Sequence, residues 1–320
     1  MAKQDILNRL IDTHEQRVIG VLKKLEDDII ADLTKSTAGG EKLTTQLAVQ
    51  LRPNLKKLIE ENYLSEVDDI IRSDYDEIIK EYQKFIRPLP IPARFKSLTK
   101  PNLEVINQLK FLSFSGFEDI ANTYLDTLAN EVYQSAIVGK DFRDMVKNIR
   151  AKINGVYQRS DETEINRLVD FIDKNRYSNN ASIKAQVSVA KETLQSKYAA
   201  DIYGDNMRRY ASQMAHDSLM QFDGQFTKYK AAEAGITNYK YTGTNIITTR
   251  DFCRNNLNKV FSEQEAIDLW ASTRWAGKSG TDPFINRGGY RCRHSFIPYD
   301  PEWENLIEEY KFFIYLLNKY

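Results

Sequence analysis

Apolar residues recur at helical spacing along most of the first 235 residues of the chain. In residues 4–34 they fall at intervals of three, four and their multiples, which predicts a single amphipathic helix. His14 lies on the same apolar stripe, and a histidine in that position is more often a packed core residue than a ligand. The stripe is narrow and has charged flanks, so it has the form of a packing seam.

Two further helical blocks follow, and each contains residues that favour a break. Residues 43–86 keep the helical spacing, with an interruption expected near Pro53 because proline lacks the amide hydrogen of a helix interior. Residues 101–153 are also predicted to be helical, punctuated at Gly116 and Gly139. The first half of the chain is therefore expected to contain several helices and no strand.

The pattern changes at Gly235. Residues 182–234 are predicted to be mostly helix, bent near Gly204 and near Gly224. Beyond Gly235, residues 238–242 alternate in polarity and are rich in β-forming side chains, which predicts a strand. A second strand is expected at 291–297. These strands predict a small α+β module near the C-terminus.

Local signals complete the C-terminal part. Ser262 followed by Glu265 has the spacing of a capping box and starts a short helix. Residues 287–290 are expected to turn. The last segment is predicted to be an apolar helix that packs on its own domain, with docking to a neighbouring subunit as the alternative. Its candidate interaction residues are Trp303, Leu306, Tyr310, Phe313 and Leu317.

The chain is therefore predicted to be mainly α: an elongated helical N-terminal part, followed by a small α+β C-terminal module with a terminal helix. Alternating prolines near residue 90 favour an extended, stiff linker. The expected divisions are a helical region at 1–87, a proline-rich linker at 88–101, a helical domain at 102–235, the module at 236–300 and the terminal helix at 301–320.

Composition narrows the possible functions. Lys and Arg total 45 and Asp and Glu total 45, so there is no basic excess of the kind that a general nucleic-acid or acidic-membrane binder needs. No apolar run approaches the roughly 20 residues of a membrane span. The N-terminus lacks the form of a signal peptide, and two cysteines in 320 residues do not make a disulfide scaffold. We therefore expect synthesis in a reducing cytoplasm.

The module contains the only cluster of soft ligands. Cys292 and His294 are spaced to face the same side of a strand, and Cys253 is expected to approach from the loop after the first strand. Three zinc ligands are thus possible, and Asp251 or the distant His216 would complete a set of four. The paired C-x-x-C signal is missing, so two buried thiols are favoured, with zinc and a disulfide left open. No other cofactor is expected.

Catalytic motifs are not found in the sequence. It has no G-x-S-x-G, no glycine-rich phosphate loop and no H-E-x-x-H. An enzyme would have to place its catalytic groups in the module, where the candidates are Asp251, Arg254, Arg293 and His294. Charged groups in so small a module more often pair with one another, so the chain is expected not to be an enzyme.

The order of short motifs in the last third of the chain resembles the phage head-morphogenesis proteins, the Mu F-like minor head protein family. The similar features are an Asp-x-Cys-Arg element at 251–254, a Lys-Val-Phe element at 259–261 and a glycine-led Cys-Arg-His at 288–294. The run 220–225 is similar to the helix before the module in some members. We refer to the eight motif residues as the knuckle: Asp251, Cys253, Arg254, Gly288, Gly289, Cys292, Arg293 and His294.

This chain departs from the family pattern in three places. Many members have C-x-x-C where this chain has Cys253 and Asn256, and a final cysteine where it has His294. A glycine usually precedes the Lys-Val-Phe element, and here it is Asn258, the next-best residue for a left-handed turn. We expect Cys253 and Cys292 to lie close together in the knuckle, near Trp270 or Trp275. Arg254 and Arg293 are expected to pair with acids such as Asp251.

The resemblance implies a structural minor head protein of a tailed bacteriophage, present in multiple copies per virion. Its expected partners are the portal and the major capsid protein, and its expected place is the head interior or the portal vertex. Head assembly is the implied role, and packaged DNA is a further candidate partner through DNA delivery. Two alternatives stay open: a packaged nuclease or transferase effector that uses residues 241–299, and a coiled-coil interaction protein that uses the N-terminal seam.

Overall fold

The chain folds into long helices and one small antiparallel sheet, as the hydrophobic pattern predicted. The structure is a computed structural model that describes residues 3–37, 45–87, 92–153, 163–175, 178, 180–198, 206–246, 249–275 and 278–301. The helices before the sheet are α1 (Lys3–Ser36), α2 (Thr45–Leu58), the π-helical η1 (Ile59–Leu64), α3 (Ser65–Ile86), α4 (Ala93–Lys96), α5 (Lys100–Ile137), α6 (Phe142–Ile153), α7 (Thr163–Asn175), α8 (Ala181–Tyr198) and α9 (Met207–Ala234).

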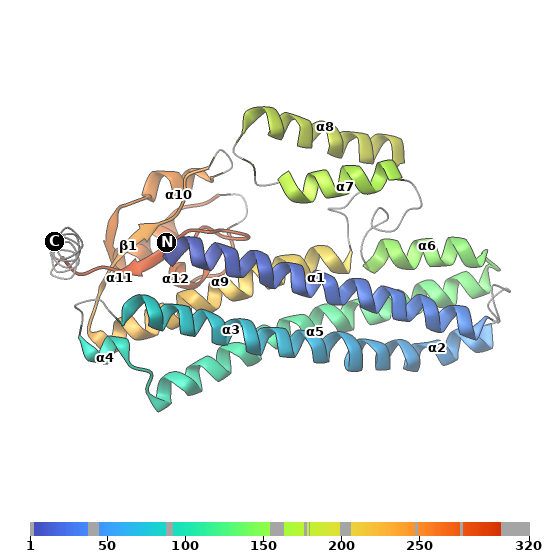
Figure 1. Cartoon of the computed structure of the whole chain (residues 1–320), viewed down its shortest axis with the longest axis horizontal. Coiled ribbons are helices and arrows are strands. Elements are labelled where there is room, and N and C mark those ends of the chain that lie inside the picture. Colours follow the sequence, from blue (N-terminus) through green and yellow to red (C-terminus); the bar gives the residue numbers. More distant parts are fainter. Residues whose placement is uncertain are drawn as a thin grey trace, which may run out of the picture. The chain divides into compact units, whose positions relative to one another are not determined.

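The elements of the C-terminal module follow α9 in the chain (Figure 1). They are β1 (Asn238–Thr242), α10 (Asp251–Asn256), β2 (Val260–Ser262), α11 (Glu263–Ser272), α12 (Pro283–Asn286) and β3 (Ser295–Pro298). The predicted terminal helix, with its five candidate interaction residues, lies outside the described residues, as do Gly204 and residues 88–91 of the proline-rich segment.

Two compact units make up the chain, and each is assembled from separate segments. Unit 1 comprises Met1–His14, Ile71–Ser113 and Ala215–Tyr320, and unit 2 comprises Glu15–Ile70 and Phe114–Met214. The division falls inside α1, α3, α5 and α9, so each of these helices contributes residues to both units. The boundaries expected from the sequence, at the prolines and after α9, fall within the residues of unit 1.

The described residues of unit 2 form helices and the turns between them, and no strand is among them. Burial of Leu51, Leu55, Ile59 and Tyr63 at helical spacing carries the helical chain straight through Pro53 into η1. The expected interruption at Pro53 is therefore wrong. A proline inside a helix costs about 3 kcal/mol, and the burial of this apolar stripe outweighs it.

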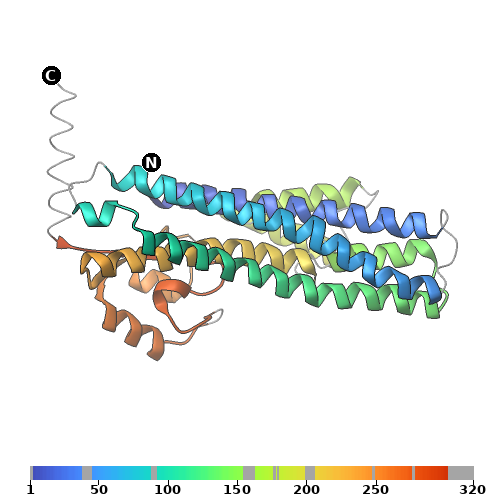
Figure 2. The same cartoon turned by 90° about the horizontal axis from the view of Figure 1, so that it is seen from below.

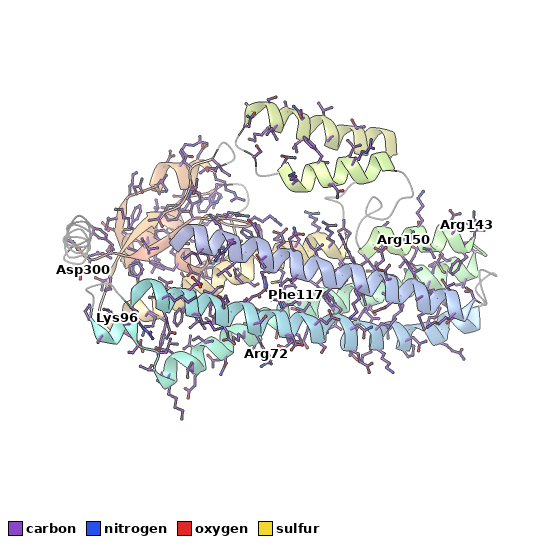
Figure 3. All side chains as sticks on the ribbon, in the orientation of Figure 1. Arg72, Lys96, Phe117, Arg143, Arg150 and Asp300 are labelled. Atoms are coloured by element: carbon purple, nitrogen blue, oxygen red, sulfur yellow. The ribbon has the colours of Figure 1, made fainter. Side chains whose placement is uncertain are left out.

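Ion pairs and close packing join the helices of unit 2. Nε of Arg150 on α6, labelled in Figure 3, lies 3.4 Å from Oε1 of Glu26 on α1. Glu26 is buried. Gly116 does not break α5, contrary to expectation. Met214 packs so closely against Gly116 that a Cβ there would lie 2.6 Å from the methionine Cε, so glycine serves packing and not termination.

Unit 1 is organised around the C-terminal half of α9. The ring of Phe222 on this helix lies 4.4 Å from the ring of Tyr75 on α3, measured between centroids. The ring of Phe226 meets the ring of Tyr82 edge-on, with 5.5 Å between centroids. The helix α9 is continuous through Gly224, which admits the backbone of α12, since a Cβ there would lie 2.3 Å from the carbonyl oxygen of Phe284. Figure 2 shows α9 in gold running beside the orange elements of the module. The module therefore rests on a rigid helix.

The sheet has the strand order β2-β1-β3, and both pairings are antiparallel. Tyr239 and Tyr241 of the central strand are buried, as the predicted alternation requires. In the register of the sheet, Tyr241 lies opposite Phe296 of β3. The capping box is also confirmed: the Ser262 hydroxyl accepts from the Glu265 amide, and the Glu265 carboxylate accepts from the Ser262 amide.

Candidate metal centre

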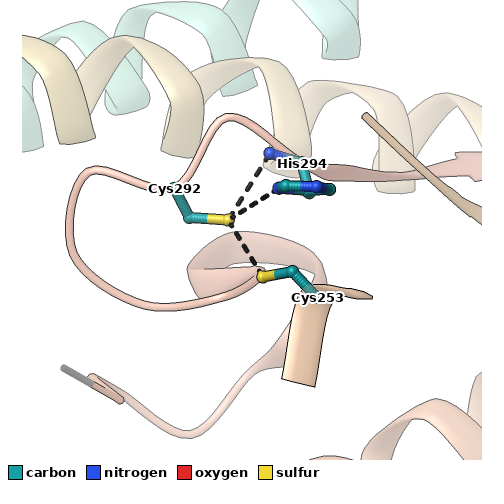
Figure 4. Close-up of side chains that lie close together, drawn as sticks. All are labelled: Cys253, Cys292 and His294. Carbon is teal, nitrogen blue, oxygen red and sulfur yellow. Dashed lines mark hydrogen bonds between the residues drawn. The ribbon is translucent and has the colours of Figure 1, made fainter. Parts of the chain in front are cut away.

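Three residues that are far apart in the sequence meet in the interior of the module (Figure 4). Cys253 comes from α10, and Cys292 and His294 come from the loop before β3. The two sulfur atoms are 3.8 Å apart, and Nδ1 of His294 lies 3.7 Å from the Cys292 sulfur. Both cysteines are free thiols. The predicted proximity of Cys253 and Cys292 is therefore confirmed, and we call the three residues the thiol–imidazole cluster.

The backbone that carries the cluster differs from the prediction. Cys253 lies on a helix and not in a loop, and β3 begins only at Ser295, so Cys292 and His294 do not lie on a strand. Arg291 has a φ of 53° and the Cys292 amide donates to the Gly289 carbonyl at 3.2 Å, so the chain turns here. The turn, and not strand alternation, directs both side chains inward.

Glycines allow the cluster to close. A Cβ on Gly288 would lie 2.3 Å from the Cys253 sulfur and 2.6 Å from the Cys292 sulfur. A Cβ on Gly243 would lie 2.4 Å from Cδ2 of His294. Any larger residue would therefore displace the cluster. Cys253, Cys292 and His294 are only 1%, 3% and 6% exposed, so solvent is nearly excluded.

Tyr241 of β1 forms one wall of the cluster. Its hydroxyl donates to the Cys253 sulfur at 3.2 Å, and its ring stacks on the imidazole of His294 at 5.6 Å between centroids. Burial raises the pKa of Tyr241 well above its ordinary value, so the phenol stays a donor. No role was predicted for Tyr241, although its inward position in the alternating strand is a signal for one.

The two thiols are electrostatically unequal. Hydrogen bonding from Cys253 lowers the pKa of Cys292, assisted by His294 and the Arg287 guanidinium, although burial opposes the shift. The pKa of Cys253 is raised, first by its hydrogen bond to Cys292 and then by burial. The His294 amide also points at the Cys292 sulfur, at 3.4 Å. Cys292 is thus the first of the pair to become a thiolate.

Arg287 is an unusual neighbour for two thiols. Its side chain is 1% exposed, and its Nε and Nη1 have no hydrogen-bond partner among the described residues. Burial lowers the pKa of Arg287, and the negative charges of Cys292 and Asp217 oppose that shift. Because an arginine keeps its proton in proteins, the module holds a buried positive charge beside the cluster. The sequence pattern did not single this residue out.

The loop that carries Cys292 and His294 is fixed from several sides. The Arg291 amide donates to Oδ1 of Asp217 on α9 at 2.8 Å, and Nη2 of Arg250 donates to the Tyr290 carbonyl at 2.7 Å. Nη2 of Arg293 lies 2.6 Å from Oδ1 of Asp12 at the start of α1. These contacts place the loop before any ligand binds.

An aromatic shell covers the other side of the cluster. The ring of Phe252, next to Cys253, stacks on Trp275 at 4.0 Å and meets Trp270 edge-on at 5.7 Å. Nε1 of Trp275 donates to the Gly288 carbonyl at 3.0 Å. The prediction that a tryptophan packs near the two cysteines is therefore confirmed, and this shell lowers the local dielectric.

The remaining predicted residues lie outside the cluster. Asp251 is exposed and lies 3.5 Å from Arg254, the ion pair expected from the sequence. Arg293 pairs with Asp12 and not with Asp251. His216 is buried and lies 3.1 Å from Asp217, and burial lowers its pKa. Neither Asp251 nor His216 joins the described group of possible metal ligands, so neither completes the set.

Two turn residues of the motif match their expected roles. Gly289 has a φ of 92°, which glycine adopts at little cost. Asn258 has a φ of 64°, so it takes the left-handed conformation for which asparagine is the usual substitute. Both keep the backbone of the motif segments in the conformation that closes the knuckle.

Comparison with known proteins finds no family model, curated protein or solved structure that matches this chain. Within the described part of the chain, none of the helices has both the length and the apolar character needed to cross a membrane.

Proposed function

We propose that this chain is a structural minor head protein of a tailed bacteriophage. In this role it associates with the portal or the inner face of the capsid, in several copies per virion, and acts in head assembly and in DNA delivery. The proposal rests on the motif resemblance and on one structural observation. The separate motif segments converge on a buried cluster, whose three residues are at most 6% exposed.

This observation favours a structural role over the enzyme alternative. The four candidate catalytic residues lie in three separate environments: Asp251 pairs with Arg254 at the surface, Arg293 pairs with Asp12, and His294 is buried against Cys292. A substrate cannot reach the imidazole without opening the module. The knuckle therefore supports the fold, and assembly takes place on other surfaces of the chain.

The coiled-coil alternative requires a free apolar seam on α1. In the folded chain most of the predicted seam is at most 7% exposed (Val18, Val21, Leu25, Ile29 and Leu33), and Ile6 and Leu10 are half-buried. This seam is already used for packing within the chain. Self-association through residues 1–36 would have to undo that packing, so the observation favours the head-protein proposal.

Purified particles test the proposal. Heads produced by the genome that encodes the chain are analysed by quantitative mass spectrometry, and the gene is deleted in parallel. We expect the chain in the heads at fewer copies than the major capsid protein, and a loss of infectious particles in the deletion. The neighbouring genes are expected to encode a portal, a large terminase and a major capsid protein.

Two outcomes would overturn the proposal. One is a chain that is missing from purified heads, together with a deletion strain that assembles normal infectious heads. The other is turnover of a substrate that is lost in Asp251→Asn or His294→Gln protein which remains folded by circular dichroism. The second result would establish the packaged enzyme instead.

A further inference from the structure

We infer that Cys253, Cys292 and His294 form a zinc site that locks the C-terminal module. The sequence alone favoured two buried thiols, and the structure changes that preference. The inference concerns the isolated chain and does not depend on the proposed role in phage heads.

Distances between the candidate ligands match those of a zinc centre. Zinc binds cysteine sulfur at about 2.3 Å and histidine nitrogen at about 2.0–2.1 Å in tetrahedral geometry. Those bond lengths place two sulfur ligands about 3.8 Å apart, and a sulfur and a nitrogen about 3.6 Å apart. The observed separations are 3.8 Å between the Cys253 and Cys292 sulfurs and 3.7 Å between the Cys292 sulfur and His294 Nδ1. These two separations match, and all three ligand atoms lie within 4.8 Å of one another, so one ion can reach them.

The imidazole lacks the partners that a buried histidine normally has. Nε2 of His294 is buried without a hydrogen-bond partner among the described residues, and Nδ1 meets only the Cys292 sulfur. Buried polar groups in native proteins are nearly always satisfied, and an orphan at such a place indicates an ion or a water molecule. A zinc ion on Nδ1 would give that nitrogen a ligand, and Nε2 would then carry the ring proton and be left for a water molecule.

The surroundings favour the ligand form of the sulfurs. Zinc binds thiolates, and a nearby arginine and hydrogen bonds to sulfur stabilise that charge. The buried Arg287 lies beside Cys292, the His294 amide points at the same sulfur, and the Tyr241 hydroxyl donates to Cys253. Such contacts orient the sulfur ligands and stabilise their negative charge.

The donor set also indicates which metal binds. Two thiolates and one imidazole are soft to borderline ligands, which suit zinc and not magnesium or calcium. Three protein ligands leave a fourth position for a water molecule. Since the cluster is buried and packed closely against Gly243 and Gly288, we assign the site a structural role.

Metal analysis of the full-length chain tests the inference. The protein is purified under reducing conditions without chelator, then titrated with zinc and, separately, with cobalt as a spectroscopic substitute. We expect one zinc ion per chain in the wild type, and protection of both thiols from alkylation. With cobalt we expect a sulfur-to-metal charge-transfer band and the visible bands of a tetrahedral site.

Variants separate ligation from general damage to the fold. Cys253→Ser and Cys292→Ser are expected to lose stoichiometric zinc and the charge-transfer band. His294→Cys keeps three ligands, so it should still bind zinc, and its cobalt charge-transfer band should rise about 1.5-fold because three thiolates replace two. His14→Asn is the matched control: His14 is equally buried, lies outside the cluster and should leave zinc binding unchanged.

Several results would overturn the inference. Wild-type protein that stays free of zinc at micromolar concentrations and gives no charge-transfer band with cobalt would show two plain buried thiols. A Cys253–Cys292 disulfide that is present in native protein purified under reducing conditions would show that the two thiols are a redox pair. Zinc that stays bound in both serine variants would place the metal elsewhere. None of these results bears on whether the chain is found in phage heads.

Discussion

At the scale of single residues, glycine determines how closely the sulfurs of the cluster approach. Replacing Gly288 with alanine would place a Cβ 2.3 Å from the Cys253 sulfur and 2.6 Å from the Cys292 sulfur, far inside contact distance. Overpacking of a tight core costs about 1–3 kcal/mol. We expect Gly288→Ala to lower the free energy of unfolding by that amount, measured by urea denaturation of the full chain.

Gly20→Ala is the matched control for this substitution. Gly20 lies in the exposed face of α1, and a Cβ there would have no neighbour within 4 Å. Alanine in a helix interior is about 0.5–1 kcal/mol better than glycine, so this variant should be more stable than the wild type. Equal effects of the two substitutions, in sign and size, would contradict the close packing of Gly288.

The residue scale also shows what the sequence could reveal of the site. Two cysteines at the ends of a short module were predicted to meet, because so small a core leaves few ways to hold its ends together. Tyr241, Arg287 and Asp217 were missed. Their roles depend on which side chains are buried beside the sulfurs and on a turn at Arg291, and neither follows from spacing along the chain.

Between elements, a carboxylate joins α5 to α6 within unit 2. Oε1 of Glu131 on α5 accepts from Nδ2 of Asn148 on α6 at 2.7 Å, from Nζ of Lys140 at 3.1 Å and from Oγ of Ser135 at 3.3 Å. Hydrogen bonds to a charged group are stronger than those to a neutral one. We expect Glu131→Gln to lower the free energy of unfolding at pH 7 by about 1 kcal/mol.

This contribution of Glu131 should depend on pH. Burial alone would raise the pKa of Glu131, but the bonds from Asn148, Lys140 and Ser135 lower it below 4.5. A depressed carboxyl pKa stabilises the fold above the unfolded value and loses that effect as pH falls through the folded value. The difference between wild type and Glu131→Gln should therefore be full at pH 7 and shrink below pH 4.5.

Unfolding curves of both proteins at a series of pH values check this expectation. Glu60→Gln is the control, because Glu60 makes an exposed pair with Lys56 at 3.5 Å, and such pairs contribute about 0–1 kcal/mol. A difference between wild type and Glu131→Gln that stays constant from pH 7 to strongly acidic pH would show that the carboxylate charge is not involved.

The helix predictions succeeded where local spacing determines the structure, and they failed where contacts with distant segments do. Periodicity located the long helices, the first strand and the capping box, since each is recorded in local spacing. The expected breaks at Pro53 and Gly116 were wrong. At each of these positions burial or a close contact from a distant segment outweighs the local preference, which a linear pattern cannot show.

At the scale of the whole molecule, the chain is not built from consecutive domains. Segments of unit 1 come from the beginning, the second quarter and the end of the chain, and unit 2 takes the residues between them. Domain boundaries were predicted at the prolines and after Gly235, because the composition of the chain changes there. A change in composition marks a change of local structure, and the grouping of distant segments depends on contacts that composition does not record.

Removal of zinc is expected to affect amide exchange in unit 1 and not in unit 2. The thiol–imidazole cluster belongs to unit 1, whereas the Glu131 contacts belong to unit 2. If zinc holds Cys253 on α10 to the loop of Cys292 and His294, chelation should let these segments open locally while the distant helices keep their hydrogen bonds. Hydrogen exchange of the full chain, with and without chelator, should show amide exchange in α10 and residues 287–294 faster by at least about tenfold, equivalent to about 1.4 kcal/mol. Exchange of the α6 amides should not change.

Two variants serve as controls. The His14→Asn protein should respond as the wild type does, and the Cys292→Ser protein should exchange fast with or without chelator. Uniform acceleration across both units, or no acceleration near the cluster, would contradict a local metal lock.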